Sequence, residues 1–389
     1  MDFELSDEQQ LIIDNVRRFI REEIRPLEAD LDPDAFTLRP EDDERLRQMV
    51  KDMGLYQMDV PEEYGGPGVD TVTRTLVAEE ISQHRAGLYA PAYGVFGNGP
   101  QGQLYNGTDE QKEQYLWPTI RGEKSGFFGL SEPSGGSDPA RAIQTRGVRD
   151  GDEWVINGSK LWNSGADTAD YGIVYVRTDP SKGRQGISAF IIDTDTPGFR
   201  VERLVQVLRA HYTTELSFTD MRVPHANLLG EEGGGFALAN DYLARNRIPY
   251  SAAGIGIAVF AHEMAVDWAK QRVTFGEPLA SRQAIQWMLV DNEIDIRTAR
   301  WACLAAADKA EKGLPFRFES SMAKLVSTEG AGRVVDRCMQ IMGGLGMSKD
   351  LPMERWYREL RIRRIGEGPS EVQRIVMARD LLNIGSGSR

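Results

Sequence analysis

The spacing of apolar residues along the chain changes character twice. The first part has the three-to-four-residue period of amphipathic helices, beginning with Ile13, Val16, Ile20 and Ile24. Ser6 and Gln9 form a capping box just before this run, and Pro26 is predicted to end it. Similar patterns return over about 71–84 and 108–121. We therefore predict that the N-terminal part of the chain is all-α.

The middle of the chain shows no helical period. Short runs rich in β-branched and aromatic residues lie instead between turn residues, at 171–178, 187–193 and 214–218. The dipeptides Asn157-Gly158 and Asp150-Gly151 are typical of hairpin turns between strands. These features predict a compact antiparallel β domain.

The last part returns to the helical period in four long stretches, at about 236–273, 281–312, 318–343 and 370–383. Such helices, each apolar on one face, predict a four-helix bundle, and Pro249 is expected to kink the first. The predicted fold class is therefore α+β and multidomain, with an N-terminal all-α domain (1–122), an antiparallel β domain (123–232) and a C-terminal helical bundle (233–389).

Composition limits the classes of partner. The 389 residues include 59 acidic and 46 basic side chains, and the net charge of −13 argues against nucleic acid or an anionic membrane as partner. No apolar run reaches the roughly 18 residues of a membrane-spanning helix. Cys303 and Cys338 lie in apolar helical runs, as core residues would, and the opening MDFELSDEQQ lacks the apolar region of a signal peptide. We expect a cytoplasmic protein that binds a small ligand.

Several common catalytic motifs do not occur in the sequence. The four histidines are scattered without the spacing of metal ligands, at His84, His211, His225 and His262. The chain also lacks the GxSxG, Walker A and GxGxxG motifs. No metal site, serine-nucleophile site or Rossmann nucleotide site is therefore predicted.

Four stretches could contact a polar ligand. Backbone N–H groups and hydroxyls are presented by loop 129–138 (GLSEPSGGSD), and an aromatic ring precedes a hydroxyl in segment 161–165 (LWNSG). Arg272 ends a helix within reach of a phosphate, and segment 340–347 (QIMGGLGM) ends another helix in glycines. On its own, each stretch is better explained structurally, as a turn, a core tryptophan, a helix-ending arginine or a C-cap.

A fifth stretch, 364–372, has the sequence RIGEGPSEV and places a carboxylate between two glycines. The glycines and Pro369 keep Glu367 out of a helix interior. Ser370 and Gln373 form a predicted capping box that opens the last helix. Taken alone, the stretch is better explained as a solvated surface acid than as a functional carboxylate.

The order and spacing of these stretches resemble the acyl-CoA dehydrogenase family over residues 2–383. The resemblance rests on five segments: GLSEPSGGSD, WNSGADTADY, MRVPHANLLGEEGGGF, RVTFGEPLASRQ and QIMGGLGM…RIGEGPSEVQR. It implies the helical–β–helical acyl-CoA dehydrogenase fold, one FAD per subunit, and an acyl-CoA substrate. It also implies an electron-transferring flavoprotein as electron acceptor and a homotetramer built from the C-terminal bundles.

The same resemblance implies roles for particular residues. Those expected to line the flavin are Phe128, Leu130, Ser131, Ser137, Trp162 and Ser164. Those expected to hold the pyrophosphate and adenosine end from a neighbouring subunit are Arg272, Phe275, Gln283, Gln340, Gly343 and Gly344. Ser370 is one further expected cofactor contact. The expected substrate contacts are Ser137, Arg247 and Gly368.

In the reaction that the resemblance implies, Glu367 takes the α-proton of the thioester while the β-hydrogen passes as hydride to flavin N5, which gives a trans-2-enoyl-CoA. Burial by substrate is expected to raise the pKa of this carboxyl toward the working pH. Some members carry the base on the first long helix of the bundle, where this chain has Asn246, which cannot act as a base. Pro369 stands where the family usually has threonine, so the contacts of that threonine are missing.

Other functions stay open at this point. The same fold serves acyl-CoA oxidases and enoyl-CoA reductases, a related fold serves flavin monooxygenases, and a non-catalytic helical scaffold is a further alternative. The sequence does not define the acyl chain. Arg85 lies near the position where dicarboxylyl-CoA members place an arginine, although a surface arginine is the simpler explanation.

Overall fold

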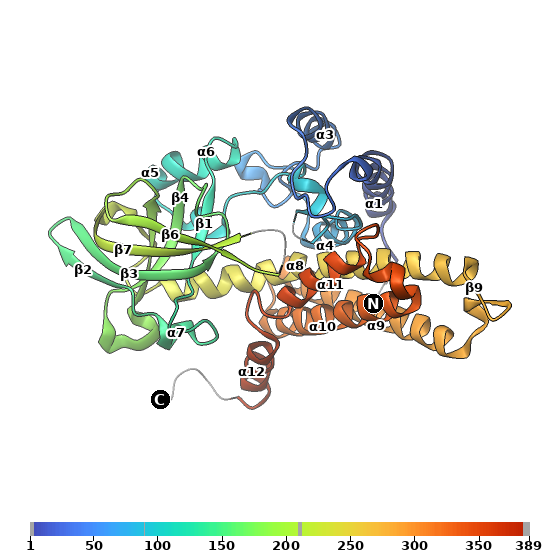
Figure 1. The fold of residues 1–389 in the computed structure, drawn as a ribbon. Helices are drawn as coiled ribbons and strands as arrows, with labels where there is room; N and C mark the ends of the chain where they lie inside the picture. The colour runs from blue at the N-terminus through green and yellow to red at the C-terminus, as the bar shows by residue number, and fades with distance from the viewer. Residues whose placement is uncertain (1–3, 89, 209–211, 384–389) are drawn as a thin grey trace. The chain divides into compact units, whose positions relative to one another are not determined.

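The computed structural model describes residues 4–88, 90–208 and 212–383 (Figure 1). Two compact units are present. A helical unit comprises the chain up to Asn98 and from Ala244 onward, and a β unit comprises Gly99–Leu243. The predicted α+β class, with helical parts at both ends of the sequence and a sheet between them, is confirmed.

The helical unit begins with α1 (Asp7–Phe19), α2 (Arg25–Leu27), α3 (Pro40–Asp52) and α4 (Thr71–Glu80). The predicted capping box is present, because the N–H of Gln9 donates to Ser6 Oγ and the N–H of Ser6 donates to Gln9 Oε1. The prediction that Pro26 ends the run is wrong. A π-helical turn over Ile20–Ile24 shifts the hydrogen-bond register, so the chain stays helical through Pro26 to Leu27.

The C-terminal part contains α8 (Gly235–Gln271), α9 (Gln283–Glu311), α10 (Arg317–Met342), α11 (Met353–Arg363) and α12 (Ser370–Leu381), with a small hairpin of β9 (Val273–Thr274) and β10 (Glu277–Pro278). Helix α8 runs through Pro249. The sequence prediction missed α11, since only Met353, Trp356 and Leu360 supply buried apolar side chains in a segment dominated by charge.

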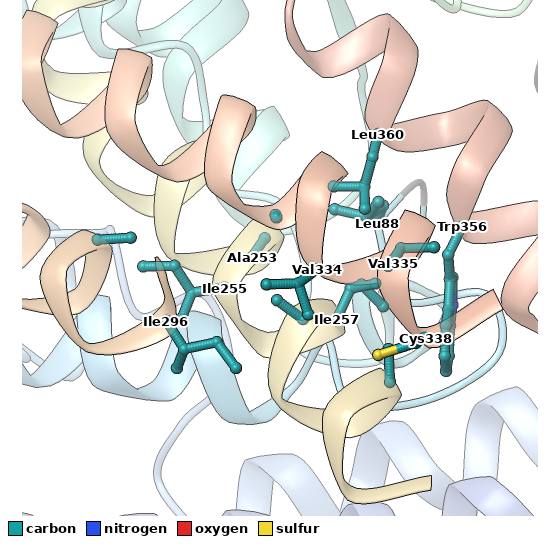
Figure 2. Packing of buried hydrophobic residues seen from close by; sticks show 14 of the residues in the cluster. Leu88, Ala253, Ile255, Ile257, Ile296, Val334, Val335, Cys338, Trp356 and Leu360 are labelled. Carbon is teal, nitrogen blue, oxygen red and sulfur yellow. The ribbon is translucent and has the colours of Figure 1, made fainter. Parts of the chain in front are cut away.

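One apolar cluster fills the centre of the helical bundle (Figure 2). It combines many alanines of α8, α9 and α10 with larger side chains such as Ile257, Val334 and Trp356. Cys303 and Cys338 are both buried and unbridged, so their predicted role as core residues is confirmed. Each fully buried aliphatic side chain stabilises the folded state by about 1.5–3 kcal/mol. The loop between α11 and α12 is therefore attached to a stable bundle.

The β unit contains one eight-stranded sheet, formed by β1 (Gly126–Gly129), β2 (Arg146–Asp150), β3 (Glu153–Asn163), β4 (Tyr171–Arg177), β5 (Ile187–Asp193), β6 (Phe199–Gln206), β7 (Tyr212–Pro224) and β8 (Leu228–Leu229). The path is β6-β7-β3-β2-β4-β5-β8, and β1 pairs with β4. The pairs are antiparallel except β1–β4 and one β2–β4 bridge, which are parallel. Short helices of this unit are α5 (Asp109–Gln111), α6 (Trp117–Ile120) and α7 (Pro139–Ala142).

The two predicted hairpin turns have different outcomes. The turn at Asp150-Gly151 is confirmed, because β2 and β3 pair antiparallel with Asp150 opposite Glu153. The turn at Asn157-Gly158 is wrong, because both residues lie inside β3 at a bulge in its pairing with β7. A Cβ at Gly158 would lie 2.5 Å from Thr145 Oγ1. The glycine therefore permits the close approach of the segment that contains Thr145 and does not form a turn.

Candidate active site

Glu367 lies in the loop between α11 and α12 with a backbone φ of 56°. A residue with a side chain costs about 1–2 kcal/mol in this left-handed conformation, so its surroundings must hold it there. A Cβ at Gly366 would lie 2.8 Å from Tyr250 Oη, and one at Gly368 would lie 2.8 Å from Gln373 Nε2. A side chain at Gly366 would thus displace Tyr250, and Gly368 also has a φ of 88°, which favours glycine.

Side chains from three helices hold the backbone of this loop. Arg247 of α8 donates through Nε to the carbonyl oxygen of Glu367 at 3.0 Å. Lys324 of α10 donates through Nζ to the carbonyl oxygen of Gly368 at 2.9 Å. Gln373 of α12 donates to both carbonyl oxygens, at 3.2 and 2.8 Å. All three donors are buried, so the carboxylate is carried by a fixed loop and is not a mobile surface acid.

The capping box predicted for α12 is wrong. Pro369 occupies the N-cap position and makes no side-chain hydrogen bond. Ser370 is the first helical residue, and its Oγ donates to Glu329 Oε1 at 2.6 Å. Gln373 turns back to the loop carbonyls instead of the helix start. The hydroxyl of Ser370, a predicted cofactor contact, is therefore engaged inside the helical unit.

The carboxyl of Glu367 is desolvated and incompletely paired. Its Oε2 is buried and has no hydrogen-bond partner among the residues that the structure describes. Burial raises the pKa of this carboxyl, while the positive charges of nearby cations and a hydrogen bond from Asn246 lower it. The cations are Arg247, Arg363 and Lys324. A raised pKa and an unused buried lone pair are the properties of a general base that awaits a proton donor.

In the β unit, the residues predicted to line the flavin lie on and after β1 and at the end of β3. Phe128 packs against the rings of Tyr175 and Tyr242, at centroid distances of 5.2 and 5.3 Å. Leu130 is buried, whereas Ser137 and Ser164 are exposed. Within this unit, backbone pairing joins the two segments, because the N–H of Leu161 donates to the carbonyl oxygen of Ser131 at 2.9 Å.

A buried ion pair fixes the first of these segments. Lys160 Nζ lies 2.8 Å from Glu132 Oε1 and donates to the carbonyl oxygen of Leu130 at 3.2 Å. The Glu132 carboxylate also accepts the N–H groups of Gln144 and Thr145. Burial lowers the pKa of Lys160 to about 8, against the opposing charge of Glu132. The pair sets the backbone of residues 130–132 without using any of the exposed hydroxyls.

Trp162 has the features of a residue that contacts a flat ligand. Its side chain is 54% exposed although it lies on a strand, and its backbone φ is 69°. Strained backbone of this kind clusters at ligand sites, and an exposed indole offers a flat apolar face on which a ring can stack. Together with the exposed hydroxyls of Ser137 and Ser164, this aromatic face fits a partly polar ring system such as a flavin.

The residues predicted to contact the cofactor of a neighbouring subunit are all exposed: Arg272, Phe275, Gln283, Gln340, Gly343 and Gly344. Phe275 is 98% exposed and has a φ of 52° at the tip of the β9–β10 hairpin. The other five lie at the ends of α8 and α10 and at the start of α9. This exposure agrees with the predicted contacts to a second copy but does not test them.

Arg85 is engaged in backbone hydrogen bonds. Its guanidinium donates to the carbonyl oxygens of Lys349 and Asp350 at 3.1 and 3.2 Å. Both contacts favour the structural explanation over binding of a distal carboxylate. In the described ranges, no cluster of histidine, cysteine and carboxylate side chains could hold a metal ion, and no helix is long and apolar enough to cross a membrane. His211 lies outside those ranges.

Sequence reasoning missed two residues that hold the loop, Lys324 and Gln373. A usable signal existed for Lys324, which falls on the face of α10 that otherwise carries buried small residues such as Ser320, Ser327 and Ala331. A lysine on such a face is rare unless its ammonium is paired. For Gln373 the only signal pointed to a cap, which the structure does not contain.

Three family models match consecutive parts of the chain. They are the acyl-CoA dehydrogenase N-terminal domain (residues 6–123), middle domain (127–221) and C-terminal domain (233–382). The chain belongs to the acyl-CoA dehydrogenase family. The prediction of an FAD-dependent oxidoreductase of this family is therefore confirmed.

Individual relatives cover nearly the whole chain. It is 39% identical to the short-chain specific acyl-CoA dehydrogenase of Clostridium acetobutylicum, over 97% of this chain and 99% of the relative. It is 36% identical to the acryloyl-CoA reductase (NADH) of Anaerotignum propionicum, over 98% and 96%. The structure of butyryl-CoA dehydrogenase from Megasphaera elsdenii matches with a TM-score of 0.86 at 35% identity, over 98% of this chain and all of the other.

Proposed function

We propose that this protein dehydrogenates an acyl-CoA thioester to the trans-2-enoyl-CoA, with Glu367 as the base that removes the α-proton. The observation that carries the proposal is the buried, unpartnered Oε2 of Glu367 on a residue held in a left-handed conformation. A solvated surface acid would need neither the burial nor the backbone strain.

The chemistry follows from the position of this carboxyl. A thioester carbonyl acidifies the α-hydrogens, and a desolvated carboxylate with a raised pKa accepts one of them as the β-hydrogen leaves with its electron pair. Bound FAD supplies the acceptor for that hydride. Gly366 and Gly368 bring the backbone close to the substrate, and the N–H of Glu367 would donate to the thioester oxygen, where negative charge develops.

The residues that would hold FAD come from two places in the sequence. Trp162 would cover the ring, with Ser131, Ser137 and Ser164 as polar contacts and Phe128 and Leu130 as apolar ones. The exposed positions at the ends of the bundle helices would hold the rest of the cofactor of a neighbouring copy. The proposal includes Arg247 and Gly368 as substrate contacts, since both lie directly against Glu367.

We further propose a homotetramer. Helix α9 carries four apolar side chains that are each more than half exposed: Trp287, Val290, Ile294 and Trp301. Their spacing of three, four and seven residues puts them on one face, and tryptophans are enriched where copies of a chain pack together. Analytical ultracentrifugation should show a tetramer, and Trp301→Glu should lower its stability. A monomeric wild-type protein would contradict this assembly.

The proposal includes an electron-transferring flavoprotein as the acceptor of electrons from the reduced flavin. It also includes a cytoplasmic location for the protein. It also keeps the domain boundaries 1–122, 123–232 and 233–389, which lie close to the limits of the three family models.

The decisive test is the variant Glu367→Gln. It keeps the shape of the side chain but cannot accept a proton, so we expect at least a 1000-fold slower bleaching of the flavin by acyl-CoA under anaerobic conditions, with FAD still bound. A panel of acyl-CoAs on the wild type would identify the chain class at the same time. Substantial bleaching by the Gln variant would show that Glu367 is not the base.

A second candidate is reduction of a 2-enoyl-CoA. The relative from Anaerotignum propionicum that is named an acryloyl-CoA reductase (NADH) supports it. The same Glu367 would then give its proton to the α-carbon. If photochemically reduced enzyme is reoxidised faster by crotonyl-CoA than the oxidised enzyme is bleached by butyryl-CoA, the reductase assignment is favoured.

A further inference from the structure

Lys324 is a fully buried cation next to the proposed base. It lies on α10 with no exposed surface, and its Nζ donates to two backbone carbonyls, of Gly368 at 2.9 Å and of Arg364 at 3.3 Å. These two residues stand on either side of Glu367. The ammonium therefore links the two ends of the loop that carries the base. Both bonds are charge-assisted, which a neutral side chain could not provide.

The loop needs such a clamp because its conformation is unfavourable by itself. Glu367 has a positive φ, and the N–H of Ser370 returns to the carbonyl oxygen of Arg364 at 3.2 Å. Arg247 and Gln373 hold the Glu367 carbonyl from the other helices. Lys324 adds a side-chain donor that bonds both the start of the turn, at Arg364, and its end, at Gly368.

The charge of Lys324 also acts on the carboxyl. The groups that face Glu367 are Arg247 and Asn246 from α8, Arg363 from α11 and Lys324 from α10. The pKa of Lys324 is lowered to about 8, first by burial and then by the positive charge of Arg247. The negative charges of Glu367 and Glu329 act in the opposite direction. The lysine is thus charged at neutral pH and favours the ionised form of the carboxyl.

We propose that Lys324 is a positioning residue for this reaction, which holds the turn around Glu367 and keeps its carboxyl in the proton-accepting form. This inference rests on the role proposed above for Glu367.

The test compares three variants of the FAD-loaded protein. Lys324→Met removes the charge and the donors, Lys324→Gln keeps a donor without the charge, and Lys324→Arg keeps both. The measurement is the rate of anaerobic bleaching by the best acyl-CoA between pH 5 and 9. Ser327→Ala, one turn away on the same buried face, is the matched control, since its hydroxyl donates to the helix carbonyls of Ala323 and Lys324 and not to the carbonyls of the Glu367 loop.

We expect the acid limb of the profile to move up by about one pH unit in Lys324→Met and Lys324→Gln, which is about a 10-fold slower rate at pH values below the limb. Lys324→Arg should restore most of the shift, and Ser327→Ala should follow the wild type. If Lys324→Met does not fold, the profile of Lys324→Gln decides.

An unshifted acid limb in folded, FAD-loaded Lys324→Met or Lys324→Gln would overturn the inference. That result is distinct from failure of the proposed function, which would appear as activity in Glu367→Gln. A Met variant that loses FAD while its remaining holoenzyme keeps the wild-type profile would show a purely structural lysine and would also count against it.

Discussion

Removing the buried charge of Lys160 should destabilise the β unit and weaken FAD binding. The ammonium is fully buried, 2.8 Å from Glu132 Oε1, and also holds the carbonyl of Leu130. In Lys160→Met the Glu132 carboxylate would stay buried without its cation. Loss of one partner of a buried pair costs about 3–5 kcal/mol. That is a large part of the roughly 5–15 kcal/mol by which proteins are stable, so a marked fall in the unfolding midpoint is expected.

The assay is urea unfolding at pH 7 with saturating FAD, followed by circular dichroism, with FAD release measured separately by its fluorescence. The double variant Lys160→Met/Glu132→Gln removes both charges and should recover at least half of the loss. Lys182→Met is the matched control, because Lys182 pairs with Asp179 at 3.1 Å on the surface of the same unit and should have almost no effect. A loss no larger than that of Lys182→Met, or a double variant whose cost equals the sum of the single costs, would refute the reasoning.

Three other outcomes follow from the site. The bleaching rate should fall as the pH drops through the raised pKa of Glu367, because the protonated carboxyl accepts no proton; a rate that does not fall at any acidic pH at which the protein stays folded would contradict this. Arg85→Ala should change the KM for glutaryl-CoA and butyryl-CoA equally, since its contacts are backbone carbonyls, and a loss confined to glutaryl-CoA would show carboxylate binding. Trp162→Ala should weaken FAD binding about 10-fold in a fluorescence titration, whereas an unchanged affinity would place the flavin elsewhere.

The sequence pointed to the candidate base through the family resemblance, because the residue types of the Gly-Glu-Gly stretch alone do not separate a surface acid from a base. In the structure a Cβ at Gly366 would lie 2.8 Å from Tyr250 Oη, and Gly368 has a φ of 88° that favours glycine. The sequence Gly-Glu-Gly before a helix therefore indicates a tight loop with unusual backbone angles, and this can be recognised without coordinates. The loop sequence does not show where the carboxyl points or which charges surround it, because these depend on side chains of α8, α10 and α11.

Local rules failed where a distant contact used the same residue for another purpose. Gly158 satisfies the pattern of a hairpin turn, but the structure needs it at a bulge against Thr145. Gln373 satisfies the pattern of a capping box, but its amide is taken by the loop carbonyls. In each case the sequence showed that the residue type has a special role but did not show which residue it contacts. Short-range patterns contain no information on tertiary contacts.

The two buried lysines show the same limit and one way past it. Lys160 and Lys324 each place an ammonium under a loop, against a backbone carbonyl, where burial lowers the pKa of both to about 8. Burial of an ammonium is costly unless its donors are satisfied, and in both places the bound carbonyls belong to a loop with a proposed role in cofactor or substrate binding. A lysine on an otherwise apolar or small-residue face is therefore a sequence signal for a buried, paired ammonium, even when the carbonyls that it binds are visible only in the fold.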